Sequence, residues 1–203
     1  MSGVDLHVAY HMSRGIFAAI LRVFFRMRVR GKEHIPREGP FILASNHVSY
    51  LDPPVLGVAC PRKLSYMARH DLFSSSFASW WLYAVGCFPV KRGSGDIAAF
   101  KTAIRKLNEG EALLVFPEGG RQAQGTALKE PEPGIGMLAS RLGVPVIPAF
   151  VSGTEKALPK GARSILPSKI FVYFGKQINI ERGSPYQNAA NLIMERIRRL
   201  ACS

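Results

Sequence analysis

The sequence predicts an α/β fold in which helices flank a mostly parallel, mixed sheet, preceded by an N-terminal amphipathic helical segment. From residue 40 onward, short apolar runs alternate with helical patterns, which is typical of βαβ units. The first thirty residues instead carry one long helical pattern with basic residues along one side. The chain has 203 residues, of which 47% are hydrophobic, and this is enough for one full core. We therefore expect a single domain over residues 1–203, made of a helical segment 1–28 and an α/β core 29–203.

The N-terminal segment has two faces at helical spacing. One face carries the polar residues His7, His11, Arg14, Arg22 and Arg26, and the other carries Ile16, Phe17, Ile20, Leu21, Phe24 and Phe25. Such a helix either docks on the protein's own core or lies in a membrane interface, with arginines at the headgroups and phenylalanines below them. The basic net charge favours the membrane interface.

A second apolar segment, from Phe73 to Phe88, contains two tryptophans and a tyrosine. These rings suit a membrane interface because each has an apolar body and a polar group. An ordinary buried helix explains the segment equally well. The residues expected at the membrane are Arg14, Phe17, Arg22, Phe24, Phe25, Arg26, Trp80 and Trp81.

The charge balance is strongly basic, with 27 Lys and Arg against 14 Asp and Glu and a formal net charge of +13. Such a field attracts nucleic acids, anionic lipid surfaces and phosphorylated substrates alike. Nucleic-acid binding is the weakest of these, because the basic residues accompany apolar faces and not exposed stacking aromatics. The three cysteines, Cys60, Cys87 and Cys202, lack metal-type spacing and favour reduced thiols in a cytosolic compartment. We find neither a signal-peptide pattern nor the apolar run of about 20 residues that a spanning helix needs.

The elements of the core are predicted in order from apolar runs and from residues that begin or end helices. A helix over 95–111 is capped by Asp96 and followed by Gly110, a second over 133–145 is closed by Gly143, and a third over 184–201 has Ser184 as cap and Pro185 at its first position. Strands are expected within 40–45, 63–68, 87–92, 112–120, 144–151 and 169–175.

Three polar stretches follow predicted strands: "NHVSYLD" at 46–52, "KRGSGD" at 91–96 and "PEGGR" at 117–121. In parallel sheets, ligands usually bind at the carboxyl ends of the strands. We therefore expect these stretches to line one cleft.

His47 and Asp52 are the candidate catalytic pair. Imidazole accepts a proton near neutral pH, and a neighbouring carboxylate fixes its tautomer and stabilises the imidazolium. A substrate that brings its own hydroxyl needs no serine nucleophile. Asp52 precedes Pro53 and Pro54, so a plain helix N-cap is the alternative.

The "PEGGR" loop is a candidate phosphate site. Backbone N–H groups at Gly119 and Gly120 can approach a phosphate closely, and Arg121 can grip it bidentately. Glu118 is expected either to hold that arginine or to bond to a substrate hydroxyl, and Arg92 is a further phosphate anchor. A solvated Glu–Arg pair in a turn and an exposed basic loop are the alternatives.

Taken together, these blocks resemble the glycerolipid acyltransferase family, to which the 1-acylglycerol-3-phosphate acyltransferases belong. The family pattern is N-H-x4-D, then G-x-x-F-x-x-R, then F-P-E-G-x-R, then V-P-[IV]-x-P. Here these blocks are "NHVSYLD", "GCFPVKR", "FPEGGR" and "VPVIP", in the same order. The segments "GTEKALPKG" and "VYFGKQI" are also similar, so the resemblance runs from about Val29 to Ile180.

The resemblance implies transfer of a fatty acyl group from acyl-CoA or acyl-carrier protein to the free hydroxyl of 1-acylglycerol-3-phosphate, which gives phosphatidic acid in phospholipid biosynthesis. His47 and Asp52 would be catalytic, and Arg92, Glu118 and Arg121 would hold the glycerophosphate. It implies no metal or prosthetic group. It also implies a peripheral or monotopic enzyme that contacts a lysophospholipid and an anionic membrane surface, on the cytoplasmic face of the cell membrane.

Two departures from the family pattern leave the acceptor open. Gly120 and Gln122 stand where F-P-E-G-T-R-S has threonine and serine, and "EGGR" is more usual in enzymes that acylate glycerol-3-phosphate. Glu132 stands where a basic residue often precedes "PG", and Lys129 is the candidate substitute. Glycerol-3-phosphate or another lysolipid is thus the alternative acceptor. The non-enzyme alternative is a basic protein that binds the membrane periphery.

Overall fold

The computed structural model describes residues 3–91, 96–122, 128–159, 161–162 and 164–202. The helices are α1 (Gly3–Val23), α2 (Asp52–Ala59), α3 (Ser76–Ala84), α4 (Ile97–Asn108), α5 (Pro133–Leu142), α6 (Thr154–Ala157) and α7 (Tyr186–Ala201), with short 3₁₀ turns η1 (Lys32–His34) and η2 (His70–Phe73). The strands are β1 (Arg28–Arg30), β2 (Phe41–Ser45), β3 (Leu64–Arg69), β4 (Cys87–Val90), β5 (Ala112–Val115), β6 (Val146–Ser152) and β7 (Phe171–Phe174).

The seven strands form one sheet in the order β1-β7-β6-β2-β5-β3-β4. Every neighbouring pair is parallel except β6 and β7, which are antiparallel. This confirms the predicted mostly parallel, mixed sheet. The central strand β2 pairs with β5 through Ala44 and Val115. Because both strands end at the same edge, the loops that follow them, 46–52 and 117–121, lie next to each other.

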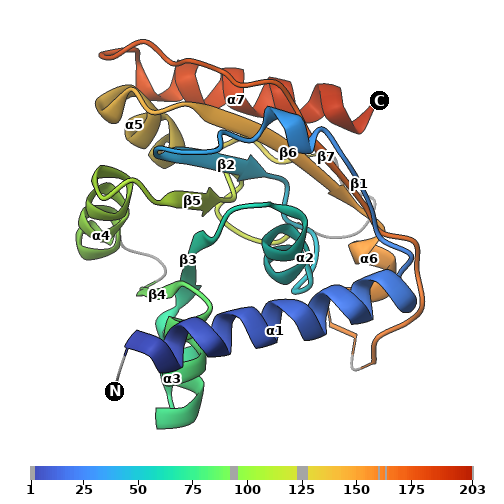
Figure 1. The fold of residues 1–203 in the computed structure, drawn as a ribbon. Coiled ribbons are helices and arrows are strands. Elements are labelled where there is room, and N and C mark those ends of the chain that lie inside the picture. Colours follow the sequence, from blue (N-terminus) through green and yellow to red (C-terminus); the bar gives the residue numbers. More distant parts are fainter. Residues whose placement is uncertain (1–2, 92–95, 123–127, 160, 163, 203) are drawn as a thin grey trace.

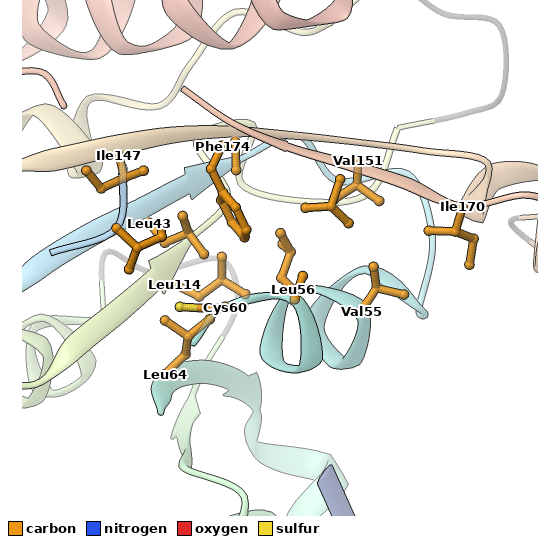
Figure 2. Close-up of a cluster of buried hydrophobic side chains, with 14 of the residues drawn as sticks. Leu43, Val55, Leu56, Cys60, Leu64, Leu114, Ile147, Val151, Ile170 and Phe174 are labelled. Carbon is orange, nitrogen blue, oxygen red and sulfur yellow. The ribbon is translucent and has the colours of Figure 1, made fainter. Parts of the chain in front are cut away.

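Helices cover both faces of the sheet (Figure 1). On one face α1 and α2 pack against the sheet, and on the other lie α4, α5 and α7. The strand β2 is buried throughout, and its residues alternate between the two cores, with Leu43 in the α2 core and Ile42 in the α7 core. Figure 2 shows the α2 core, where Val55, Leu56 and Cys60 meet side chains of the sheet.

The helix α1 docks on the protein, as one of the two sequence interpretations requires. Its residue Leu21 and the following Phe25 are buried in the α2 core, so the prediction that Phe25 faces a membrane is wrong. Arg14 also turns inward, and its Nη2 donates to the Cys60 carbonyl at 2.8 Å. Arg22 and Arg26 are exposed.

The outer side of α1 nevertheless remains apolar. A stripe at helical spacing, consisting of Val8, Met12, Ile16, Ile20, Val23 and Phe24, is exposed to solvent. The helix therefore combines both interpretations, because it packs on the core with one side and presents apolar side chains with the other. Among the residues that the structure describes, none of the helices combines the length and the apolar character needed to cross a bilayer.

The predicted helix ends are correct at two helices and wrong at a third. Asp96 caps α4 by accepting from the Ala99 N–H, and Gly143 ends α5 in the left-handed region at φ 62°. Ser184 does not cap α7, because its hydroxyl donates to the Glu181 carbonyl at 2.7 Å. Pro185 is still extended (φ −55°, ψ 128°) and occupies the N-cap position, so α7 begins one residue later than predicted.

Candidate active site

The loop after β2 is organised by the carboxylate of Asp52, which is fully buried. Its Oδ2 accepts from the backbone N–H groups of Val48 (2.7 Å) and Ser49 (2.8 Å) and from Nδ1 of His47 (2.8 Å). Asp52 is the first residue of α2, and Leu51 occupies the N-cap. The carboxylate thus caps the preceding turn, not the helix, and at the same time holds the histidine.

The His47 ring is held with Nδ1 toward Asp52, so that Nε2 remains available to accept a proton. Its ring stacks on Phe116 with centroids 4.0 Å apart, and its side chain is 13% exposed. Since the carboxylate accepts at Nδ1, this nitrogen carries the proton and Nε2 carries the lone pair. His47 also lines the large cavity described below, so this arrangement suits proton removal from a hydroxyl.

Thr154 completes the surroundings of Asp52 and was missed by the sequence reasoning. Its Oγ1 donates to Asp52 Oδ1 at 2.6 Å, and the residue is fully buried. It is the first residue of α6 and lies 102 positions from Asp52 along the chain. The segment "GTEKALPKG" resembled the family, but nothing in its local pattern connects Thr154 with Asp52.

Glu118 accepts hydrogen bonds from two backbone N–H groups and not from the Arg121 guanidinium, so the predicted bond to that arginine is wrong. It is 1% exposed and is absent from the cavity wall. Its Oε1 accepts from the His47 N–H at 3.0 Å and its Oε2 from the Lys129 N–H at 3.3 Å. A second link between the same loops runs from the Gln122 N–H to the His47 carbonyl at 2.8 Å. Glu118 therefore braces the loops after β2 and β5, and its predicted contact with the substrate stays a prediction.

Because the Glu118 carboxyl is buried in this brace, the stability of the protein should depend on pH. Burial raises the pKa of the Glu118 carboxyl, although hydrogen bonds from His47 and Lys129 oppose the shift. A raised pKa in the folded state contributes stability below the unfolded pKa, and this contribution is lost as pH rises through the folded pKa. Relative to Glu118→Gln, we expect the free energy of unfolding of the wild type to fall as pH rises from about 4 toward 7. Urea unfolding of both proteins at several pH values measures this. A free energy of unfolding of the wild type that rises with pH relative to that of Glu118→Gln would contradict the prediction.

Arg121 lies at the cavity with its guanidinium stacked on Tyr50, 3.4 Å from the ring centre. Gly119, Gly120 and Lys91 also line this cavity. The stacking joins the loop after β5 to the loop after β2 and holds the guanidinium at the cavity that His47 also lines. Arg92, the other predicted anchor, lies outside the described residues. Lys129 is exposed, with Nζ 3.5 Å from Glu132 Oε1, and is not part of the cavity wall.

The cavity has a volume of about 600 Å³ and follows α2. It is lined by His47 near the start of that helix, then by Pro53, Gly57 and Val58, and by Arg14 from α1, which is hydrogen-bonded to Cys60 just beyond the helix end. Eight helical residues span about 12 Å, so the cavity extends well beyond His47 and Asp52. Apolar side chains supply most of the wall, which suits an apolar ligand.

Three residues predicted at the membrane line this cavity instead. Arg14 and Phe17 reach it from α1, and Trp81 reaches it from α3. Trp81 Nε1 donates to Ser13 Oγ at 3.0 Å, which joins the two helices. Trp80 is half-buried and its ring contacts Phe77. Within the described ranges, no three His, Cys, Asp or Glu side chains gather as they would around a metal ion.

Comparison with known proteins identifies the family. The model of the family described as Acyltransferase matches residues 26–152. The chain belongs to this acyltransferase family. A 1-acyl-sn-glycerol-3-phosphate acyltransferase of Bacillus subtilis is 30% identical over 145 residues, which are 71% of each chain. A lyso-ornithine lipid O-acyltransferase of Pseudomonas aeruginosa is 30% identical over 162 residues, 79% of this chain and 60% of that protein. The chain spans 45% of the chloroplastic relative LPAT1 of Arabidopsis thaliana.

The crystal structure of the 1-acyl-sn-glycerophosphate acyltransferase PlsC from Thermotoga maritima has the same fold. It superposes with a TM-score of 0.78 at 23% identity and covers 98% of this chain and 80% of that one.

In this acyltransferase, two of the four sequence blocks meet directly. The blocks "NHVSYLD" and "FPEGGR" are joined by the Glu118 brace and by the stacking of Arg121 on Tyr50. The block "VPVIP" supplies the first residues of β6, and Val151 further along this strand holds the Asn46 side chain through both its N–H and its carbonyl. The predicted proximity of the loops after β2 and β5 is thus confirmed.

Proposed function

We propose that this chain transfers a fatty acyl group from an acyl thioester to the free hydroxyl of 1-acylglycerol-3-phosphate and so forms phosphatidic acid. The observation that carries the proposal is the His47–Asp52 pair at the wall of a long, mostly apolar cavity that also contains Arg121. Both an apolar chain and a phosphate find suitable partners there. The naming of several similar proteins as 1-acyl-sn-glycerol-3-phosphate acyltransferases supports the same acceptor.

The reaction requires two proton transfers, from the acceptor hydroxyl to His47 and then from His47 to the leaving thiolate. His47 Nε2 takes the proton of the acceptor hydroxyl as its oxygen attacks the thioester carbonyl carbon. The new C–O bond forms, the C–S bond breaks, and the imidazolium returns the proton to the leaving thiolate. Asp52 stabilises the imidazolium while it exists. No step needs a metal or a prosthetic group, and the donor, acyl-CoA or acyl-carrier protein, is a co-substrate.

Arg121 has the geometry expected of a phosphate ligand. A guanidinium offers paired N–H groups that match phosphate oxygens, and the Tyr50 ring fixes its plane. Lys91 adds a further positive charge at the cavity. By the resemblance of "GCFPVKR" to the family block, Arg92 is a further phosphate ligand.

Gly119 and Gly120 differ in how strongly the fold requires glycine at their positions. Gly119 has φ +68°, and an added Cβ would lie 3.0 Å from Glu132 Cγ, whereas a Cβ at Gly120 meets nothing within 4 Å. We expect Gly119→Ala to lower the free energy of unfolding by about 1 kcal/mol or more. Gly120→Thr should leave it within about 0.5 kcal/mol of the wild type. Urea unfolding of both variants measures these changes.

Gly120→Thr also tests the acceptor, since threonine is the commoner family residue at this position. If lysophosphatidic acid is the acceptor, threonine should fit the site, and the turnover of the variant should stay within about threefold of the wild type. A side chain that fits a substrate site poorly costs roughly tenfold or more. A much larger loss would favour glycerol-3-phosphate, for which the "EGGR" form is more usual.

We also propose that the enzyme works at the surface of an anionic membrane, on its cytoplasmic face. The exposed apolar stripe of α1 supports this location, because an interfacial helix buries such a stripe in the headgroup region. The net charge of +13 suits an anionic surface, and the cytoplasmic face is where both thioester donors are found.

The deciding experiment is a thiol-release assay with long-chain acyl-CoA and acyl-carrier protein as donors. Lysophosphatidic acid, glycerol-3-phosphate and lyso-ornithine lipid are offered separately as acceptors. Turnover with lysophosphatidic acid alone supports the proposal. Turnover only with one of the other acceptors would replace it, and vesicle binding without any acyl transfer would favour the non-enzyme alternative.

A further inference from the structure

Exposed apolar side chains gather on a few elements of this protein. Among the described residues, fifteen large apolar side chains are well exposed. Six belong to the α1 stripe, three to the η2–α3 segment, and two, Ile165 and Leu166, to the segment between α6 and β7. These three elements lie along the same side of the molecule, at the bottom of Figure 1. The segment with Ile165 and Leu166 was not predicted to contact anything.

Residues 164–169 present apolar side chains although their backbone is held in place. Ile165 and Leu166 are 57% and 53% exposed, and Pro167 follows them. The Leu166 N–H nevertheless donates to the Ala157 carbonyl at 2.8 Å. Leaving two large aliphatic side chains in water forfeits the gain that their burial would give. This arrangement is expected where another phase or partner covers them.

This segment adjoins the end of the α1 stripe. The Ile170 N–H donates to the Phe25 carbonyl at 3.1 Å, and the Arg28 N–H donates to the Ile170 carbonyl at 2.9 Å. Phe25 directly follows Phe24, the last residue of the stripe. The stripe and the segment therefore border one surface.

The charges around this surface are basic. Arg22, Arg26, Arg28, Arg30, Lys156 and Lys169 are exposed, and none of them belongs to the ion pairs found in the described parts of the chain. Cations that surround aliphatic side chains complement the anionic headgroups and the acyl boundary of a bilayer. A lipid surface therefore fits this face better than an acidic protein, because a bilayer would also bury the apolar α1 stripe that borders it.

The same segment is connected to the catalytic loop. It follows α6, whose first residue Thr154 donates to Asp52. The Leu158 carbonyl, just after α6, accepts from Ser49 Oγ at 2.9 Å. One short stretch of chain thus has one end against the catalytic carboxylate and the other at the exposed surface.

We propose that residues 164–169 form a second membrane contact, separate from α1, in which Ile165 and Leu166 enter the interface of an anionic bilayer. The inference rests on the proposed function insofar as the acceptor is a membrane lipid. Contact at both α1 and this segment fixes the orientation of the protein on the bilayer. The link through Leu158 and Thr154 then holds the catalytic loop at a constant depth.

The test is sedimentation with vesicles of phosphatidylcholine and phosphatidylglycerol, without substrate. The variant is Ile165→Asp with Leu166→Asp. The matched control is Tyr186→Asp with Leu192→Asp, which makes the same charge change on α7, at the opposite side of the molecule (Figure 1). We expect the first variant to partition at least about fivefold more weakly than the wild type and the control to stay within about twofold.

Equal partitioning of the 165/166 variant and the wild type would overturn the inference, and so would an equal loss in the α7 control. Thermal unfolding identifies misfolding of the aspartate variant, in which case Ile165→Ser with Leu166→Ser decides by the same comparison. Because sedimentation measures binding and not turnover, its result is independent of acyl transfer. A failed acylation assay would overturn the proposed function alone.

Discussion

Replacing His47 with alanine is expected to lower kcat for acyl transfer by about 10² to 10⁴-fold, which is the usual contribution of a positioned general base. The reason is geometric, because His47 Nε2 is the nitrogen left free by the hydrogen bond from Nδ1 to Asp52. The fold should survive, since the hydrogen bonds from Val48 and Ser49 still hold Asp52. A thiol-release assay with a long-chain acyl-CoA and the preferred acceptor measures the loss.

His47→Asn is the sharper variant, because an amide can still donate to Asp52 but has no basic nitrogen. We expect it to lose as much kcat as His47→Ala and to bind vesicles like the wild type. If His47→Asn kept most of the wild-type turnover, the histidine would serve only to shape the loop. The general-base mechanism would then be wrong.

The loop with His47 and Asp52 was predictable because its signals are local. His47 and Asp52 are five positions apart, and the apolar run 41–45 marks the strand before them. The position of the 117–121 loop beside it followed from a parallel sheet, in which β2 and β5 end at one edge. Their resemblance to a known family added the expected order of the blocks. These inferences needed no knowledge of distant contacts.

The N-terminal segment shows where periodicity stops being informative. Its pattern correctly predicts a helix, but the apolar face that it defines is divided between the core and the solvent. Tertiary packing decides which face is buried, and here it buries Phe25 while the adjacent Phe24 is exposed. Arg26, with φ 44°, turns the chain directly after these residues. Arg14 points at a carbonyl that is 46 positions away, which no helical pattern can indicate.

The bracing contacts of Glu118 and the bond from Thr154 to Asp52 were missed for the same reason. The partners of Glu118 are backbone N–H groups 71 and 11 positions away, and a backbone donor leaves no trace in the amino-acid sequence. A buried threonine is usually only a core residue, and its role depends on which acceptor lies beside it. Positioning residues of this kind become visible only when the loops are assembled.

Thr154→Val is expected to affect stability and turnover together, because valine keeps the shape of threonine and removes its hydroxyl. Asp52 Oδ1 would then lose the 2.6 Å hydrogen bond that it accepts in a fully buried position. A hydrogen bond to a charged group contributes about 1.5–3 kcal/mol, so we expect the free energy of unfolding to fall by about that amount. Urea unfolding at neutral pH measures this loss.

For catalysis, Thr154 acts through Asp52 and is a positioning residue. A carboxylate held by Oδ2 alone can rotate and weaken its hydrogen bond to His47 Nδ1, so kcat should fall by about tenfold or more while KM for the acceptor changes little. The low-field proton resonance of the His47 Nδ1–H should shift or broaden in the valine variant. Thr154→Ser, which restores the hydroxyl, should recover both kcat and the resonance. If serine failed to rescue, or if valine changed stability but left kcat and the resonance intact, Thr154 would be a packing residue with no part in the reaction.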